Sequence, residues 1–167
     1  MLRKFFVFFL LLGLCGMLLL ALIKVLRMEG NLSPSANGMV TAEDICRRHR
    51  KVPLTEYQKG MCAYLAHEFR DDPVMIEIAF CESSWRHQDS DGRVRVNQNN
   101  DKSQTVDVGL FGFNVHWNAD LMQKHRLDPY AVRDNVRLAK HLRKKRKYQD
   151  WESSRSCWGW VLAQKQA

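Results

Sequence analysis

A single glutamate, Glu82, stands where a carboxyl group could act as a general acid. It follows residues 74–81, a run that is apolar except for Glu77, and it precedes a polar stretch. Such a run predicts a buried helix with Glu82 at its C-terminal end. Burial and the negative end of the helix dipole both disfavour the charged carboxylate. The sequence therefore predicts a raised pKa for Glu82, as proton donation near neutral pH requires.

Helices are predicted before Glu82. Thr55 predicts the start of one helix, because its hydroxyl can cap free backbone N–H groups and apolar residues follow at helical spacing. Asp71 or Asp72, followed by Pro73, predicts the start of the next helix, the one that ends at Glu82. An earlier helix is expected over residues 42–49.

The chain after this helix turns polar over residues 86–107. Within that stretch, Asp91-Gly92 is a turn signal that predicts a small β-hairpin. Further helices are expected near residues 118–124 and from Asp128-Pro129 onward. The pattern predicts a mainly α fold of the α+β class with a small β-hairpin and loop region.

Three segments carry a family resemblance: residues 78–86 (IAFCESSWR), residues 107–114 (DVGLFGFN) and the helix around Asn135-Val136. In this order they closely resemble the lytic transglycosylase and goose-type lysozyme family of the lysozyme superfamily. Residues 151–158 (WESSRSCW) resemble the ending of small secreted members. The resemblance covers about residues 66–158. It implies a lysozyme-like domain that cleaves peptidoglycan strands between N-acetylmuramic acid and N-acetylglucosamine.

The resemblance also implies roles for single residues. Glu82 would protonate the glycosidic oxygen and then take a proton from the muramyl 6-hydroxyl, giving a 1,6-anhydro product without water and without a cofactor. Ser83 would orient Glu82 or the N-acetyl group of the substrate, unless it is only a hydroxyl at the helix end. Gly109, Phe111 and Asn114 would line the cleft, although Phe111 could equally be a core aromatic.

Two positions depart from the family pattern. Gly112 stands where the family usually has glutamine, and His141 where it usually has a tyrosine near the catalytic glutamate. His141 could donate a hydrogen bond in place of that tyrosine, as part of the substrate-binding site, or it could be a surface histidine. The departures leave open a catalytically degenerate protein of the same fold that binds peptidoglycan or acts as a scaffold.

An inverting hydrolase is a further alternative. It would need a second carboxylate to activate water, roughly 6.5–9.5 Å from the first. Candidates follow Glu82 in the polar stretch: Asp89, Asp91, Asp101 and Asp107. Asp107 is the candidate at a position that is often acidic or polar in the family.

Four cysteines lie beyond the N-terminal segment, and an even number after an export signal predicts disulfides. Three pairings are available to them. Cys46 and Cys62 are equally distant from Leu54, so a turn there would bring two predicted helices and these cysteines together. Cys81 would then pair with Cys157. The spacing does not match a zinc site, and we expect no metal.

The N-terminus contains a run of 19 uncharged residues, 5–23. This is close to the roughly 20 residues that span a bilayer, and it exceeds the usual apolar core of a signal peptide. We predict a signal anchor over residues 1–27, a polar linker over 28–40 and one domain over 41–167. The domain would lie outside the cytoplasmic membrane on a single-pass anchor, or be secreted if the segment is cleaved.

The chain is basic, with 26 Lys and Arg against 18 Asp and Glu, a net charge of +8. This balance suits an anionic partner such as cell-wall polymer or lipid headgroups. No zinc-finger or aromatic RNP pattern accompanies it, so no nucleic-acid partner is predicted. The expected partners are peptidoglycan glycan strands and, through the N-terminal segment, the membrane. The sequence identifies no protein partner.

Overall fold

The computed structural model of the chain describes residues 39–98 and 105–164. The predicted anchor over residues 1–27 and almost all of the linker lie outside the described residues. Residues 37–167 form one compact unit, which contains every helix and strand named below. Within the described residues, no helix has both the length and the apolar character needed to cross a bilayer.

Three helices precede the candidate acid: α2 (Ala42–His49), α3 (Glu56–Glu68) and α4 (Pro73–Ser83). Thr41 and Thr55 each form a capping box with the residue three positions on, which fixes the starts of α2 and α3. Pro73 occupies the first turn of α4, where its missing N–H costs no helical hydrogen bond. These bounds confirm the helices predicted from the sequence.

The β element is a three-stranded antiparallel sheet in the order β1-β2-β3. Its strands are β1 (Val96–Gln98), β2 (Val106–Val108) and β3 (Phe113–Asn114). The turn at Asp91-Gly92 forms, with Gly92 at φ +81° and a single bridge between Gln88 and Val94. The sheet that bears on Glu82 lies later in the chain, and it pairs Asp107 with Asn114.

The second half of the chain contains α5 (Ala119–His125), α6 (Val132–Arg146), the 3-10 helix η1 (Gln149–Ser154) and α7 (Arg155–Gln164). The helix predicted from Asp128-Pro129 onward begins later, at Val132. Residues 128–131 form a turn in which the Ala131 N–H donates to the Asp128 carbonyl. The Asp128 N–H is bound by the Asp134 carboxylate, so Asp134 fixes this turn from the first turn of α6.

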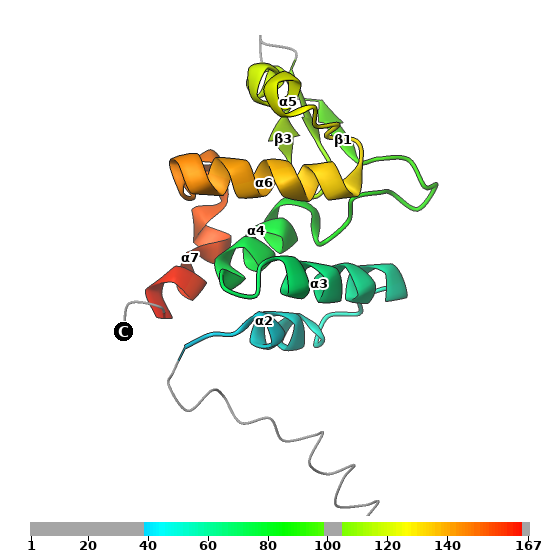
Figure 1. Cartoon of the computed structure of the whole chain (residues 1–167). Coiled ribbons are helices and arrows are strands. Elements are labelled where there is room, and N and C mark those ends of the chain that lie inside the picture. Colours follow the sequence, from blue (N-terminus) through cyan, green and yellow to red (C-terminus); the bar gives the residue numbers. More distant parts are fainter. Residues whose placement is uncertain (1–38, 99–104, 165–167) are drawn as a thin grey trace, which may run out of the picture. The chain divides into compact units, whose positions relative to one another are not determined.

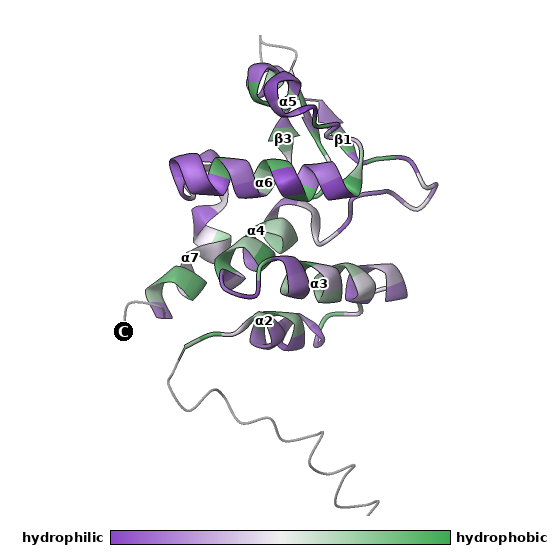
Figure 2. Cartoon of the chain, viewed as in Figure 1, coloured by the Kyte–Doolittle hydropathy of each residue, from purple (hydrophilic) through white to green (hydrophobic). Residues whose placement is uncertain are grey.

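Helix α4 forms the centre of the core, with α2 and α3 on one side of it and α6 on the other (Figure 1). Its first seven residues, Pro73 to Ala79, are all buried. Figure 2 shows the contrast between the apolar α4 and the largely hydrophilic α6. An all-round apolar helix is stable only when other elements cover every face, which is the arrangement found here.

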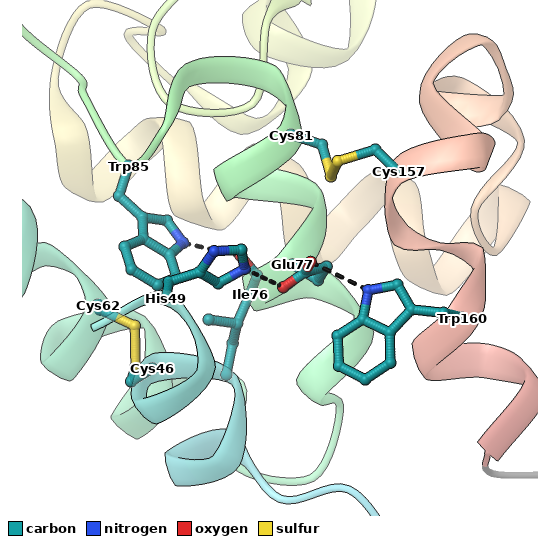
Figure 3. Close-up of polar contacts among 9 residues, drawn as sticks. All are labelled: Cys46, His49, Cys62, Ile76, Glu77, Cys81, Trp85, Cys157 and Trp160. Carbon is teal, nitrogen blue, oxygen red and sulfur yellow. Dashed lines mark hydrogen bonds and ion pairs between the residues drawn. A yellow bond between two sulfur atoms is a disulfide. The ribbon is translucent and has the colours of Figure 1, made fainter. Parts of the chain in front are cut away.

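Two disulfides join elements around α4. Cys46 of α2 pairs with Cys62 of α3, and Cys81 of α4 pairs with Cys157 of α7. These are the two pairs expected from the sequence. They bracket a buried polar contact between the same helices, drawn in Figure 3. There the Glu77 carboxylate binds His49 Nε2 at 2.8 Å and accepts from Trp160 Nε1 at 3.1 Å.

Candidate active site

Glu82 is the penultimate residue of α4, and the chain leaves the helix abruptly after it. Ser84 and Trp85 both adopt left-handed backbone conformations, with φ of 54° and 58°. Non-glycine residues rarely do so, at a cost of roughly 1–3 kcal/mol each, unless the surroundings enforce it. Trp85 supplies that enforcement, because its side chain is fully buried and its Nε1–H donates to the Ile76 carbonyl at 2.9 Å. The end of the helix that carries Glu82 is therefore fixed.

The half-buried carboxyl group of Glu82 contacts two distant segments. Its Oε1 accepts a hydrogen bond of 2.5 Å from Ser154 Oγ at the end of η1. Its Oε2 lies against Gly112, where a Cβ atom would be only 3.0 Å from that oxygen. Gly112 has φ +59°, so the turn before β3 brings its backbone next to the carboxyl group. Both oxygens are thus placed by tertiary contacts.

The environment raises the pKa of Glu82. Burial is the largest cause, because desolvation disfavours the anion. The hydrogen bond from Ser154 acts in the opposite direction, and the nearby charge of Asp107 raises the pKa further. The net direction agrees with the sequence prediction and suits a group that must hold a proton before giving it up.

Asp107 and Asn114 face each other across β2 and β3, beside Glu82. The Asn114 Nδ2 group donates to Asp107 Oδ1 at 3.1 Å and to Thr105 Oγ1 at 2.8 Å. The Asn114 Oδ1 atom accepts from the backbone N–H of Trp117 at 3.1 Å. The Trp117 side chain is 71% exposed. One buried amide therefore links a carboxylate near Glu82 to the backbone of a residue whose side chain is exposed.

Asn135 of α6 holds the turn between β2 and β3. It is fully buried, donates through Nδ2 to the Val108 and Pro129 carbonyls, and accepts from the Phe111 N–H. Gly109 packs so tightly here that a Cβ would lie 2.6 Å from Asn135 Nδ2. The Asn-Val segment of the late helix thus has a physical role: it positions the turn that contains Gly112.

His87 also packs against Gly109, where a Cβ would lie 2.7 Å from His87 Cε1. It is 2% exposed, and its Nε2 lies 2.9 Å from the Tyr130 carbonyl, so Nε2 carries the proton and donates it. Its buried Nδ1 has no hydrogen-bond partner among the described residues. Burial lowers the pKa of His87, because a second proton on Nδ1 would place a charge in an apolar site. A histidine in a polar stretch gives no sequence signal of such burial, and His87 was not predicted.

Three residues predicted to bind substrate make other contacts in the structure. Ser83 Oγ donates to the Ala79 carbonyl and accepts from the Arg86 N–H, so it serves as the helix-end hydroxyl. Phe111 is fully buried, where it packs as a core aromatic against Phe69, Phe113 and Trp151. His141 stacks on His125 of α5 with ring centroids 4.1 Å apart. The hydroxyl that contacts Glu82 comes instead from Ser154.

The other candidate carboxylates lie apart from Glu82 or outside the described residues. Asp91 accepts from the Arg93 N–H within the polar turn, and the backbone of Asp89 belongs to the same turn. Asp101 falls in residues 99–104, which are not described. Among residues 39–98 and 105–164, no three His, Cys, Asp or Glu side chains gather to form a metal site.

Ser154 and Trp117 are the site residues that sequence reasoning missed. A signal for Ser154 was present, because it lies three residues before Cys157, whose partner Cys81 is next to Glu82. A disulfide at Cys81 must bring the residues flanking Cys157 close to Glu82. Trp117 had no comparable signal, since an isolated tryptophan is as consistent with a core as with a surface.

Comparisons of the chain with known protein families, with curated proteins and with solved structures give no match. The chemistry of the site therefore follows from its own geometry. Glu82, with a raised pKa, a hydroxyl partner and a second carboxylate nearby, can donate a proton and later accept one.

Proposed function

We propose that this protein cleaves the glycan strands of peptidoglycan between N-acetylmuramic acid and N-acetylglucosamine, with Glu82 as general acid and base. The observation that carries the proposal is the half-buried Glu82 carboxyl group, whose pKa is raised while Ser154 binds Oε1 and Gly112 lies close to Oε2. The resemblance of residues 78–86 and 107–114 to lytic transglycosylases supplies the substrate class.

The proposed reaction needs no water. Protonated Glu82 gives its proton to the glycosidic oxygen, and the C1–O4 bond breaks to release the N-acetylglucosamine side as an alcohol. The Glu82 carboxylate then takes the proton of the muramyl 6-hydroxyl while that oxygen bonds to C1. The product is a 1,6-anhydromuramyl end, and Glu82 regains its proton.

Exposed Trp117 suits the sugar substrate, because saccharide rings present C–H faces that pack on indole. The link through Asn114 would hold the backbone of Trp117 in register with Asp107. In this reaction Asp107 stabilises positive charge that develops at C1. The proposal therefore assigns Glu82 to proton transfer, Asp107 to electrostatics and Trp117 to binding.

Hydrolysis is the second candidate, and the electrostatic coupling of Asp107 to Glu82 is the observation in its favour. In that case Asp107 would activate a water molecule, and the product would keep a reducing muramic acid end. The two reactions give products that differ by one water, so their masses separate them.

The test is digestion of purified peptidoglycan by the full chain in detergent, followed by mass analysis of the released muropeptides. We expect products one water lighter than the hydrolytic ones. Glu82→Gln should lower turnover by about 10²-fold or more, because the proton donor is lost. The matched control is Glu152→Gln, which changes an exposed carboxylate two residues from Ser154 and should leave turnover unchanged.

Other outcomes identify the alternatives. Hydrated products that disappear in Asp107→Asn would establish the hydrolase. Binding to peptidoglycan without any release by the wild type would establish a binder or scaffold. Full turnover in Glu82→Gln would refute both enzymatic proposals.

A further inference from the structure

A cavity lies on the face formed by α2 and α3. Its volume is about 800 Å³, within the range of roughly 300–1,000 Å³ that is typical of ligand pockets. Neither Glu82 nor the residues that contact its carboxyl group line this cavity. The proposed glycan chemistry makes no use of it.

The inner surface of the cavity is apolar. It is formed by the Cys46–Cys62 disulfide together with Leu54, Ala63, Ala66 and Trp85. Among the described residues, no Ser, Thr, Asn or Gln side chain lines it. The polar groups of the lining are therefore confined to its charged side chains and His67.

The charged groups around the cavity are mostly cations. Arg50, Lys59 and Arg70 line it, with Glu43 as the single carboxylate that the described part of the chain places there. Arg50 and Arg70 are exposed, and neither forms an ion pair with any residue that the structure describes. An apolar interior with cations at its edge is complementary to a ligand that has an apolar tail and an anionic head.

The turn between α2 and α3 adds an apolar tip to this face. Val52 is 47% exposed and follows the exposed cations Arg50 and Lys51. Basic residues beside an exposed apolar side chain are typical of a surface that meets the membrane interface, where each contributes favourably.

We infer that this cavity binds an anionic phospholipid, with one acyl chain against the disulfide and Ala63 and the phosphate beside Arg50 and Arg70. Arginine suits the phosphate because its planar fork can donate two parallel hydrogen bonds. The uncharged run at residues 5–23, within the predicted anchor, is joined to α2 by 18 residues, at most about 60 Å when extended, so lipid would be within reach. The site is independent of catalysis at Glu82.

The test uses the full chain in phosphatidylcholine nanodiscs that contain a phosphatidylglycerol with a photoactivatable acyl chain. After irradiation, the labelled peptides are mapped by mass spectrometry. We expect label within residues 43–70, and much less of it with a phosphatidylcholine probe of the same chain. Arg50→Glu with Arg70→Glu should lower this label about fivefold or more, and Glu43→Gln should raise it.

Matched variants distinguish the effect of charge on lipid labelling from the effect of the cavity volume. Arg93→Glu with Arg155→Glu reverses two exposed cations elsewhere and should leave the label unchanged. Ala63→Trp fills the interior without changing charge and should remove the label, whereas Ala163→Trp on α7 should not. Retention of both disulfides and of the far-ultraviolet circular dichroism shows that each variant is folded.

Several results would overturn the inference. Equal labelling by both probes would mean proximity to the bilayer and no headgroup recognition. Label that persists in Ala63→Trp would place the acyl chain elsewhere. Displacement of the label by a soluble acidic peptide, with no lipid preference, would assign the cavity to a peptide partner.

Discussion

The backbone of Gly112 lies so close to the Glu82 carboxyl group that a Cβ there would be 3.0 Å from Oε2. Contacts this short require something to move. Gly112 also has φ +59°, a conformation that side-chain-bearing residues rarely adopt. The glycine at this position, where the resembled family usually has glutamine, thus fits the close approach between this turn and Glu82.

Gly112→Ala should displace the Glu82 carboxyl group and lower turnover about tenfold or more, because small displacements of a proton donor are costly. It should also destabilise the fold by about 1–2 kcal/mol, because alanine disfavours the left-handed backbone conformation at this position. Gly92→Ala is the matched control, since Gly92 has φ +81° with open space where the Cβ would lie. In urea unfolding, the control should show a similar loss of stability, and its turnover should be unchanged. Equal turnover losses in the two variants would show that the close approach of Gly112 to Glu82 is not what matters for turnover.

Ser154 can support Glu82 in both protonation states. Its Oγ lies 2.5 Å from Glu82 Oε1 and 3.1 Å from the Trp151 carbonyl, but a hydroxyl has only one proton to donate. When Glu82 is ionised, Ser154 donates to it. When Glu82 is protonated, it can donate to Ser154, which then donates to Trp151. A residue that must be acid and then base gains a partner in either state.

Ser154→Ala should therefore raise the pKa of Glu82 further, because the hydrogen bond that favours the anion is lost. The measurement is a ¹³C titration of the glutamate carboxyl groups, which does not require turnover. In the enzyme, the high-pH limb of kcat/KM should move to higher pH, since Glu82 stays protonated longer. Ser153→Ala changes an exposed neighbouring serine and serves as the control. An unmoved Glu82 titration in Ser154→Ala would refute this role.

Glu82→Gln should stabilise the protein, and increasingly so as pH rises. The pKa of Glu82 is raised in the folded state above its ordinary value of 4.5. Above pH 4.5 the unfolded chain readily ionises this group, whereas the folded chain does so only at a cost, so wild-type stability falls through this interval. Neutral glutamine escapes that loss. Urea unfolding at a series of pH values should show a difference that grows from acidic to neutral pH and then levels.

Glu152→Gln is the control for that series, because Glu152 is an exposed carboxylate paired with Arg155. It should show no comparable stabilisation at neutral pH. A Glu82→Gln difference that does not vary with pH would mean that Glu82 ionises as freely in the fold as in the unfolded chain.

The helices and the Cys46–Cys62 pair could be predicted because they depend on local signals, and the Cys81–Cys157 pair followed by elimination. Thr41 and Thr55 specify helix starts through caps, and the apolar run before Glu82 specifies a central helix. Contacts between distant side chains have no periodic signal. The pair Ser154 and Glu82 could have been inferred only by following the Cys81–Cys157 disulfide one step further.

The start of α6 could not be placed for a related reason. Pro129 matches the pattern of a helix start, but the turn of residues 128–131 is stabilised by Asp134 binding the Asp128 N–H. Two local signals compete there, and the hydrogen bond from within α6 decides the outcome. The position of Phe111 could not be predicted either, because an aromatic residue beside a glycine can face a cleft or the core with equal ease.

His87 should make the fold less stable in mild acid. Its pKa is lowered in the folded state, so between that pKa and 6.5 the unfolded chain binds a proton that the folded chain does not. The free energy of unfolding therefore rises with pH across this interval, by up to about 1.4 kcal/mol per pH unit. His87→Gln keeps a donor for the Tyr130 carbonyl and should flatten the slope that the wild type shows below pH 6.5.

The control for His87 is His67→Gln, at a side chain that is 75% exposed, which should leave the slope intact. A remaining part of the slope is expected from His141, whose pKa is also lowered, chiefly by burial. A wild-type stability that is flat between mild acid and neutrality would show that Nδ1 of His87 finds an acceptor when protonated.

The two disulfides should differ in what they do for the site. Cys81–Cys157 closes 76 residues and Cys46–Cys62 closes 16. Loop-closure entropy predicts losses of about 4.5 and about 3 kcal/mol when each pair is replaced by alanine. Urea unfolding of the two double variants measures this difference directly.

Turnover should separate the two disulfides more sharply than stability does. Cys81 adjoins Glu82 and Cys157 lies three residues after Ser154, so this bridge holds η1 against the end of α4. Without it, the Ser154 hydrogen bond to Glu82 must compete with water, and turnover should fall even where circular dichroism shows the variant fully folded. Loss of the Cys46–Cys62 disulfide leaves Ser154 tethered beside Glu82. It should therefore lower the free energy of unfolding and leave turnover unchanged. Equal turnover in the two folded variants would mean that packing of Trp151 and Trp158, rather than the bridge, keeps Ser154 beside Glu82.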